Sequence, residues 1–369
     1  MKMSFGNSIG FVEKTDAVKY DGPFYGSIIA ELTEDCDFGE KIGQTTLEPV
    51  IHYGHDSASV EELYALNTAV LEKVYPTKTQ ETKEKIPTFD YKASVYPTPA
   101  VKTARPKVLI PVFPGTNCEY DSARAVLAAG AEADIAVIRN LTAEDVARSV
   151  EDVAKRIADS QMIFIPGGFS GGDEPDGSAK FITAFFRNPA IQEQVMKLLN
   201  DRDGLMCGIC NGFQALIKLG LVPYGKIIDT DASCPTLTFN TIGRHQSRIV
   251  RTRVASNKSP WLRLTQVGDV YNVPISHGEG KFLASEELVK QLAANGQIAT
   301  QYVDLEGNPT MDAAFNPNGS ICAIEGITSP DGRVFGKMGH SERIGKDLYA
   351  NVPGQYDIRM FEAAVKYFK

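Results

Sequence analysis

Residues 204–220 read GLMCGICNGFQALIKLG. The apolar run 204–209 predicts a buried strand, and the apolar positions of 212–219 predict a helix that follows it at once. Between them, Gly208-Ile209-Cys210-Asn211-Gly212 has the spacing of the G-x-S-x-G elbow, with Cys in place of Ser. Small residues on both sides allow a tight strand-to-helix turn that lifts the central side chain out of the sheet. We therefore expect Cys210 to act as a nucleophile.

Cys210 also has competing interpretations. The turn places it at a helix N-terminus, where the helix dipole and the N–H groups favour a reactive thiolate. A cysteine taken alone is more often an inert core residue, and Cys207 with Cys210 forms C-x-x-C, the pattern of a redox pair or half of a zinc site. Cys207 falls inside the predicted strand, however, and the sequence has no second C-x-x-C and no H-x-x-x-H. We therefore assign Cys207 to the core and expect no metal site.

Short apolar runs alternate with helical patterns over much of the remaining chain. Further strands are predicted at 107–113, 135–138 and 162–168, and helices at 122–129, 143–157 and 191–199. This alternation predicts an α/β fold, with a parallel sheet covered by helices on both faces. From residue 236 to residue 335 the strands lose their helical spacers, which indicates antiparallel additions at the edge of the sheet.

The first hundred residues have a different organisation. Residues 1–75 predict a small α+β fragment with strands at 10–12 and 27–30 and a helix at 60–74. One face of that helix carries Val60, Leu63, Leu66, Val70 and Val74. Residues 76–105 are rich in Pro, Thr and Lys, so we expect an extended linker on the outside of the protein. The main domain is then 106–369.

Composition excludes several classes of protein. The 369 residues are 43% hydrophobic and 23% charged, with 32 Gly and 20 Pro, which excludes a disordered or collagen-like chain. A net charge of -8 disfavours nucleic acid and anionic membrane surfaces as partners. No apolar run reaches the length of a membrane span, and the start lacks the apolar core of a signal peptide. Six cysteines are too dilute for a disulfide framework, so we expect a cytoplasmic protein.

A glycine-rich segment follows another predicted strand. Ligands of open parallel sheets sit beyond the carboxyl ends of the strands, and residues 166–173, PGGFSGGD, come directly after the run MIFI. Glycines let backbone N–H groups approach a ligand closely, as an oxyanion hole requires. We expect the N–H of Gly168 or Phe169 to act together with that of Asn211.

A cysteine hydrolase also needs a base and an acid that orients it. Among five histidines, His340 is the best placed, because a strand-like run ends just before it and Glu342 lies two residues on. His277, in the run PISHGEG, is the competitor, and we consider it equally as a residue that lines the site and as part of a tight turn. The acidic run Asp173-Glu174-Pro175-Asp176 is more typical of a solvated turn or a helix cap than of a metal site.

Together, GICNGFQ, IPGGFSGGDEPDGSAKF and KMGHSER resemble the class I, or triad, glutamine amidotransferases, and within them the glutaminase domain of the phosphoribosylformylglycinamidine synthases. The resemblance runs from about 106 to 369 and includes PVFPGTNCEYD and PISHGEGKF. The family often shows Pro-His-Pro-Glu-Arg, whereas Gly339 and Ser341 flank the histidine here. Residues 10–32 and the helix after them look like the end of that enzyme's synthetase region. We therefore expect the C-terminal part of a large single-chain synthase, with most of its ATP-using half absent.

The resemblance implies a flavodoxin-like fold and a role for each matching residue. Cys210 would attack the side-chain amide of glutamine to form a γ-glutamyl thioester, His340 would move the proton, and Glu342 would fix the tautomer of the imidazole. Gln214 would contact the substrate glutamine. The glutaminase domain itself would need no cofactor.

Ammonia would pass to a synthetase region of the same or a companion chain. There ATP and Mg would support conversion of formylglycinamide ribonucleotide to formylglycinamidine ribonucleotide in purine biosynthesis, as the resemblance implies. Two other functions stay open: another cysteine hydrolase or stress protein of similar fold, and a non-catalytic docking module in which the thiol is a relic.

Overall fold

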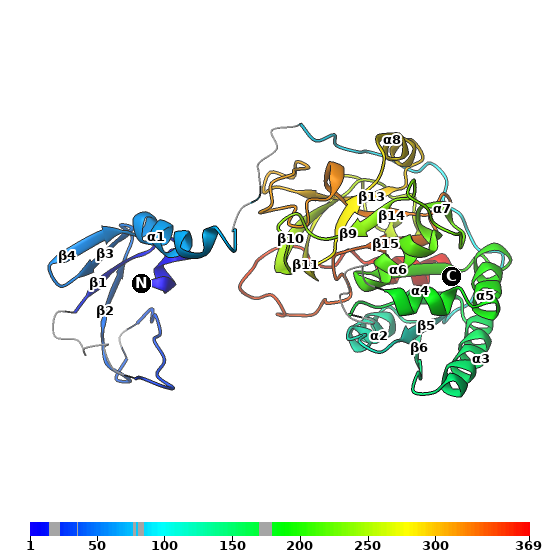
Figure 1. Ribbon diagram of the computed structural model, residues 1–369, viewed down its shortest axis with the longest axis horizontal. Coiled ribbons are helices and arrows are strands. Elements are labelled where there is room, and N and C mark those ends of the chain that lie inside the picture. Colours follow the sequence, from blue (N-terminus) through cyan, green and yellow to red (C-terminus); the bar gives the residue numbers. More distant parts are fainter. Residues whose placement is uncertain (15–22, 35, 77–78, 80–84, 170–178) are drawn as a thin grey trace. The chain divides into compact units, whose positions relative to one another are not determined.

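The computed structural model describes the chain except for residues 15–22, 35, 77–78, 80–84 and 170–178 (Figure 1). The chain divides into two compact units, Met1–Lys78 and Thr79–Lys369.

The first unit contains a four-stranded sheet, in the order β2-β1-β3-β4, and one α-helix among its described residues. These elements are β1 (Gly10–Glu13), β2 (Gly43–Thr46), β3 (Val50–Tyr53), β4 (Asp56–Ser59) and α1 (Val60–Glu72). The Ser59 side chain accepts the N–H of Glu62 and so caps α1. The strand expected at 27–30 was wrong: these residues are exposed and have no strand partner, since an apolar run forms a strand only where a sheet can bury it.

A nine-stranded sheet in the order β11-β10-β13-β14-β15-β8-β7-β5-β6 forms the centre of the second unit, as far as the structure describes it. Its strands are β5 (Lys107–Val112), β6 (Glu132–Val137), β7 (Met162–Ile165), β8 (Leu205–Ile209), β10 (Gln246–Val254), β11 (Val270–His277), β13 (Ile298–Val303), β14 (Ile324–Thr328) and β15 (Val334–Lys337). A separate two-stranded ladder pairs β9 (Thr236–Thr238) with β12 (Lys281–Leu283).

One half of the large sheet is parallel and the other antiparallel. The neighbours β15-β8-β7-β5-β6 all pair in parallel, and β7 and β8 are buried along their whole length, as strands covered on both faces must be. From β15 outward to β11 every pair is antiparallel. The parallel sheet and its antiparallel additions are thus confirmed, and β15 belongs to both halves.

Helices cover both faces of this sheet. They are α2 (Glu119–Ala128), α3 (Ala143–Asp159), α4 (Lys180–Phe186), α5 (Pro189–Asn200), α6 (Asn211–Leu219), α7 (Leu221–Tyr224), α8 (Glu286–Ala294) and α9 (Met360–Tyr367). The chain crosses from β5 to β6 in one direction and from β6 back to β7 in the other, so right-handed crossovers place α2 and α3 on opposite faces. α3 packs against α5, and α4 against α6.

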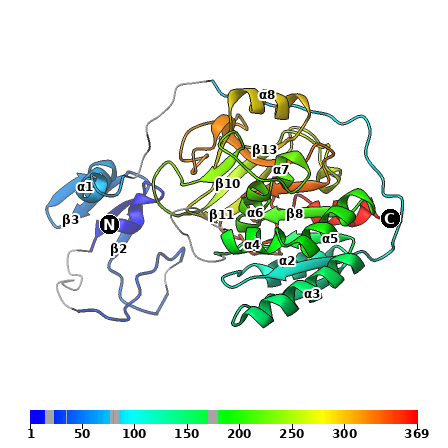
Figure 2. The same cartoon turned by 45° about the vertical axis from the view of Figure 1, so that its right-hand side comes forward.

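From Pro87 onward the predicted linker lies on the second unit. The side-chain amide of Gln301 donates to the carbonyl of Pro87 and accepts the N–H of Phe89, at 2.9 and 3.0 Å. Tyr91 N–H donates to Ala255 O. In Figure 2 this segment passes α8 and continues to the C-terminal end, where Thr103 N–H donates to Phe368 O.

No helix in the described parts of either unit has the length and apolar character that a bilayer crossing requires.

Candidate active site

Cys210 lies at the junction of β8 and α6. Its backbone has φ 54° and ψ −108°, a conformation that is strained for any residue other than glycine. Its N–H donates to Lys337 O on the neighbouring strand at 2.9 Å, and its carbonyl accepts the N–H of Gln214 in the first turn of α6. These bonds hold the turn in place, so the tight strand-to-helix turn expected from the sequence is present in the structure.

The two flanking glycines are required by close packing. A Cβ on Gly208 would lie 2.5 Å from the backbone of Gly212, and a Cβ on Gly212 would lie 2.1 Å from the carbonyl oxygen of Ile165 in β7. Both contacts are with backbone atoms, which cannot swing aside as a side chain can. The glycines therefore let α6 start directly against the ends of β7 and β8, with Cys210 at its N-terminus.

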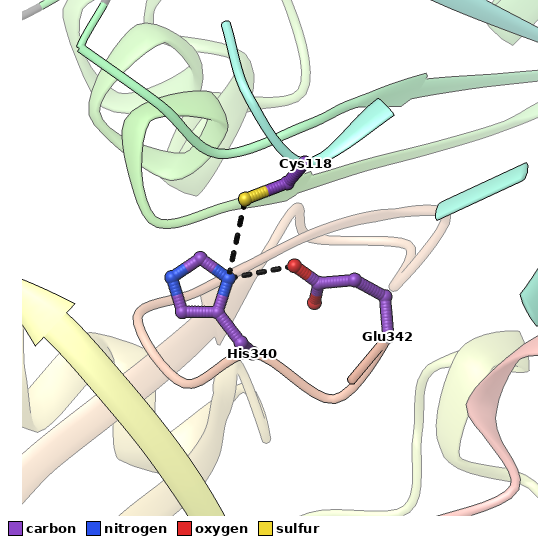
Figure 3. Close-up of side chains that lie close together, drawn as sticks. All are labelled: Cys118, His340 and Glu342. Atoms are coloured by element: carbon purple, nitrogen blue, oxygen red, sulfur yellow. Dashed lines mark hydrogen bonds and ion pairs between the residues drawn. The ribbon is translucent and has the colours of Figure 1, made fainter. Parts of the chain in front are cut away.

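His340 and Glu342 follow β15, the strand that pairs in parallel with β8. His340 Nδ1 lies 2.6 Å from Glu342 Oε1, and both side chains are buried (Figure 3). Burial alone would lower the pKa of His340, but the Glu342 carboxylate and hydrogen bonds to Cys118, Cys210 and Glu342 raise it well above its usual value. Burial would raise the pKa of Glu342, but the charge of His340 and its hydrogen bond lower it. The pair therefore favours the charged imidazolium-carboxylate form.

The thiol of Cys210 and the imidazole meet beside Gly167. A Cβ placed on Gly167 would lie 2.8 Å from His340 Cε1 and 3.4 Å from Cys210 Cβ. Cys210 Sγ itself donates to Ser276 O, 3.6 Å away in β11, and only 5% of the residue is exposed. The structure thus brings Cys210, His340 and Glu342 together from the ends of two adjacent strands.

Cys118 is a second thiol in this place, and we did not select it from the sequence. It is the N-cap of α2, and its Sγ lies 3.8 Å from His340 Nδ1 (Figure 3). The guanidinium of Arg343 donates to Cys118 Sγ at 3.1 Å. A partial signal was available, because Cys118 ends the loop that follows β5, six residues past the strand, and directly precedes α2.

Cys118, His340 and Glu342 also form a group with the side-chain types of metal ligands, their atoms lying within 4.8 Å of one another. The 2.6 Å between His340 and Glu342 is a hydrogen-bond length. Ligand atoms about a tetrahedral zinc ion lie farther apart, about 3.3 Å for bonds near 2.0 Å. The arrangement therefore favours a hydrogen-bonded His-Glu pair over a set of metal ligands.

The glycine-rich segment approaches the elbow at Gly167, and Gly168 is the next residue. Gly168 has φ 147°, and a Cβ on it would lie 2.6 Å from Gly115 O. The N–H of Phe169 already donates to that same Gly115 carbonyl at 2.8 Å. The sequence offered the N–H of Gly168 or of Phe169 as an oxyanion-hole donor. We therefore keep Gly168 as the expected partner of the N–H of Asn211, the first residue of α6. The Phe169 ring lies 6.0 Å from that of His245.

Gln214 links the elbow to the run PISHGEG. Its Oε1 accepts from Asn211 Nδ2 at 2.9 Å, and its Nε2 donates to Glu279 O at 2.6 Å. The side chain is buried. In this arrangement both ends of the Gln214 amide have protein partners, so it fixes α6 against the 277–280 turn, and its contact with a substrate stays a prediction.

His277 is buried behind this turn. Its Nδ1 lies 3.2 Å from Asn240 Oδ1, which also accepts the N–H of Gly280, so Nδ1 is the protonated nitrogen. Its Nε2 has no hydrogen-bond partner among the described residues. Burial, with the charges of His340 and His245, lowers the pKa of His277 to about 3. His277 is neutral near pH 7, and its neighbour Ser276 is the residue whose carbonyl contacts Cys210.

Cys207 is fully buried in β8, and burial raises the pKa of its thiol well above the usual value. Its assignment to the core is confirmed. The acidic run Asp173-Glu174-Pro175-Asp176 lies outside the described residues.

Residues 105–368 match the family described as the CobB/CobQ-like glutamine amidotransferase domain. A Methanococcus maripaludis protein, phosphoribosylformylglycinamidine synthase subunit PurQ, is 36% identical over 260 residues, which cover 69% of this chain and 87% of the relative. Its namesake from Aquifex aeolicus is 33% identical over 250 residues, or 67% of this chain and 95% of the relative. In the solved structure of PurLQS from Thermotoga maritima, one chain matches with a TM-score of 0.51 and 25% identity, covering 72% of this chain and all of that one.

Proposed function

The chain belongs to the CobB/CobQ-like glutamine amidotransferase family, and from that premise we propose that it is the glutaminase part of a phosphoribosylformylglycinamidine synthase. It hydrolyses glutamine to glutamate and ammonia at Cys210, His340 and Glu342. The ammonia serves the ATP-dependent conversion of formylglycinamide ribonucleotide to formylglycinamidine ribonucleotide. The observation that carries this proposal is the meeting of a strained elbow cysteine with a buried His-Glu pair in a chain related to PurQ proteins.

The reaction proceeds in two steps. Cys210 Sγ, whose proton is held by the His340 imidazolium, attacks the side-chain amide carbon of glutamine. The N–H groups of Gly168 and Asn211 stabilise the oxyanion that forms. Breakdown of this intermediate breaks the C–N bond, His340 protonates the leaving nitrogen, and ammonia departs from a γ-glutamyl thioester. His340 then takes a proton from water, whose oxygen attacks the thioester and releases glutamate and the thiol.

Two features favour Cys210 over Cys118 as the nucleophile. Glu342 occupies Nδ1 of His340 at 2.6 Å, on the side where Cys118 lies, so the other ring nitrogen is the one left to act as base. Cys210 has the strained elbow backbone, whereas the Cys118 thiol already accepts from Arg343 and donates to Asn117. Cys118 thus lies beside the ring nitrogen of His340 that Glu342 orients, and not beside the nitrogen that acts as base.

The partner is a synthetase region, on this or a companion chain. Two related proteins are named as synthase subunits, and a solved relative is titled PurLQS. Ammonia loses its nucleophilicity when it is protonated in water, so delivery through a shielded passage suits the chemistry. In this proposal residues 1–75 correspond to the end of that synthetase region and 106–369 to the glutaminase domain, and ATP and Mg act in the synthetase.

The test compares two thiols of the same site. We expect Cys210→Ala to abolish glutamine hydrolysis and thioester formation, because the other thiol of the site, Cys118, lies at the ring nitrogen of His340 that Glu342 occupies. The matched control, Cys118→Ser, keeps a group that can bond to Arg343 and should retain turnover. Ammonia and glutamate release measure the effect. Hydrolysis that persists in Cys210→Ala would reject the mechanism.

A second measurement separates the other functions. A diazoketone analogue of glutamine should alkylate Cys210 selectively, as peptide mapping would show. A docking module with a relic thiol would not react selectively, and a hydrolase of another specificity would turn over esters or peptides in preference to glutamine.

A further inference from the structure

A buried ion pair lies directly beneath the loop that carries His340. Lys337 Nζ is 3.3 Å from Glu325 Oε1, and the two side chains are 1% and 0% exposed. Lys337 ends β15 and Glu325 lies on the neighbouring strand β14. Burying two charges is expensive unless the remaining hydrogen-bonding capacity of both groups is satisfied. The partners that satisfy them therefore indicate what the pair does.

Those partners flank His340 on both sides. The Lys337 ammonium donates to Gly339 O at 3.0 Å and to Ser341 Oγ at 2.9 Å. Glu325 Oε1 accepts the N–H of Gly339 at 2.6 Å. The pair thus binds both backbone groups of the residue before His340 and the side chain of the residue after it.

Further bonds orient the same loop and the pair beneath it. Glu325 Oε2 accepts from the hydroxyl of Thr300 in β13, so the carboxylate is fixed from a third strand. The N–H of His340 donates to Pro274 O in β11 at 2.9 Å. The loop is therefore bonded to three strands, β11, β14 and β15, while β13 fixes the Glu325 carboxylate. The Lys337-Glu325 pair provides the charged contacts of the loop.

The pair also explains the unusual neighbours of the histidine. In the family motif that this segment resembles, proline often stands on both sides of the histidine, which would stiffen the loop through the backbone. A Cβ at Gly339 would lie 2.6 Å from Val273 Cγ2 and 3.0 Å from Glu325 Oε1, so a side chain there would displace its neighbours. Proline would also remove the N–H that Glu325 accepts. In this chain, hydrogen bonds from a buried ion pair provide the stiffness that proline would supply.

Lys337 is bonded to the nucleophile as well as to the residues on either side of the base. Its carbonyl accepts the N–H of Cys210 at 2.9 Å, while its ammonium holds Gly339 and Ser341. One residue thus connects the turn that presents the thiol with the loop that presents the imidazole. A shift of about 1 Å between such groups can lower a rate about a hundredfold.

We propose that Lys337 and Glu325 are positioning residues that set the His340 imidazole against the Cys210 thiol. This inference rests on the proposed function, because the residues that are positioned are its nucleophile and its base. Neither side chain needs to touch glutamine. Their removal should therefore lower kcat for glutamine hydrolysis and leave KM for glutamine nearly unchanged.

The experiment uses the full chain and compares Lys337→Met with Arg333→Met. Arg333, in the turn before β15, forms ion pairs with Asp203 and Asp331, so its loss also removes charge contacts from the unit, but away from His340. We expect Lys337→Met to lower kcat about a hundredfold, and Arg333→Met to lower thermal stability with kcat unchanged. Circular dichroism verifies that each variant is folded at the assay temperature.

A milder pair of variants tests the same bonds without removing a charge. Ser341→Ala removes one acceptor of Lys337 and should lower kcat about tenfold, whereas Ser341→Thr keeps the hydroxyl and should restore most of the rate. If Ser341 contributed to stability alone, the Ala and Thr variants would have the same kcat. This pair decides the matter if Lys337→Met does not fold.

The outcomes separate the two proposals. If Cys210→Ala abolishes hydrolysis while Lys337→Met loses no more kcat than Arg333→Met, the positioning role is overturned and the proposed function stands. Equal kcat in Ser341→Ala and Ser341→Thr would overturn it too. Continued hydrolysis in Cys210→Ala would instead reject the proposed function.

Discussion

His277 makes the second unit sensitive to acid. Its pKa is about 3 in the folded chain and near 6.5 when the residue is exposed on unfolding. Between these values the unfolded chain binds a proton that the native chain does not, so this histidine lowers stability as the pH falls from about 6.5 to 3, by about 1.4 kcal/mol per pH unit. We expect His277→Asn, whose amide can still donate to Asn240, to flatten this dependence. Urea unfolding at several pH values measures it, and equal acid sensitivity in both proteins would contradict the burial of a neutral imidazole.

The residues of the site divide into those that the sequence indicated and those that it did not. Cys210, His340 and Glu342 could be selected because small residues and strand ends mark them locally. Cys118 carries a partial local signal that we did not use. Lys337 and Glu325 carry none: a lysine and a glutamate are ordinarily surface residues, and only the pairing of β14 with β15 turns them into a buried pair.

At the scale of elements, the start of α6 depends on Gly212. A methyl group there would overlap the carbonyl of Ile165, so Gly212→Ala should move α6 away from β7 and destabilise the unit by about 1–3 kcal/mol. Gly345→Ala is the control, since the nearest atom to a Cβ at Gly345 is 4.0 Å away. Free energies of unfolding in urea compare the two variants, and equal values would refute the packing argument.

Elements with a strong apolar pattern were predicted well. The strands β5, β7 and β8 and the helices α3 and α5 lie where the sequence placed them, with ends that differ by a few residues. The helices α4 and α8 were not predicted, although Ser285 caps α8 through the N–H of Leu288, a signal that short helices often carry. No strand forms at 27–30, because a run of four apolar residues does not specify a sheet or helix that would bury it.

At the scale of the whole molecule, we expect the two units to be thermodynamically separable. Among the described residues of Met1–Lys78, only Ile51 and Val60 have buried apolar side chains, and the predicted apolar face of α1 leaves Leu66 and Val70 exposed. Such a core is marginal. Residues 79–369 produced alone should therefore keep the unfolding midpoint and the Cys210 alkylation rate of the full chain. A lower midpoint in the shortened chain would show that the first unit stabilises the second.

The backbone at Cys210 has a consequence for protein engineering. Glycine adopts positive φ without strain, so Cys210→Gly would release the tension of the turn while leaving its hydrogen bonds in place. A selection that rewards heat resistance alone would favour glycine at this position. The selected proteins would be more stable but would lack the attacking sulfur. At this turn stability favours glycine, whereas the reaction requires cysteine.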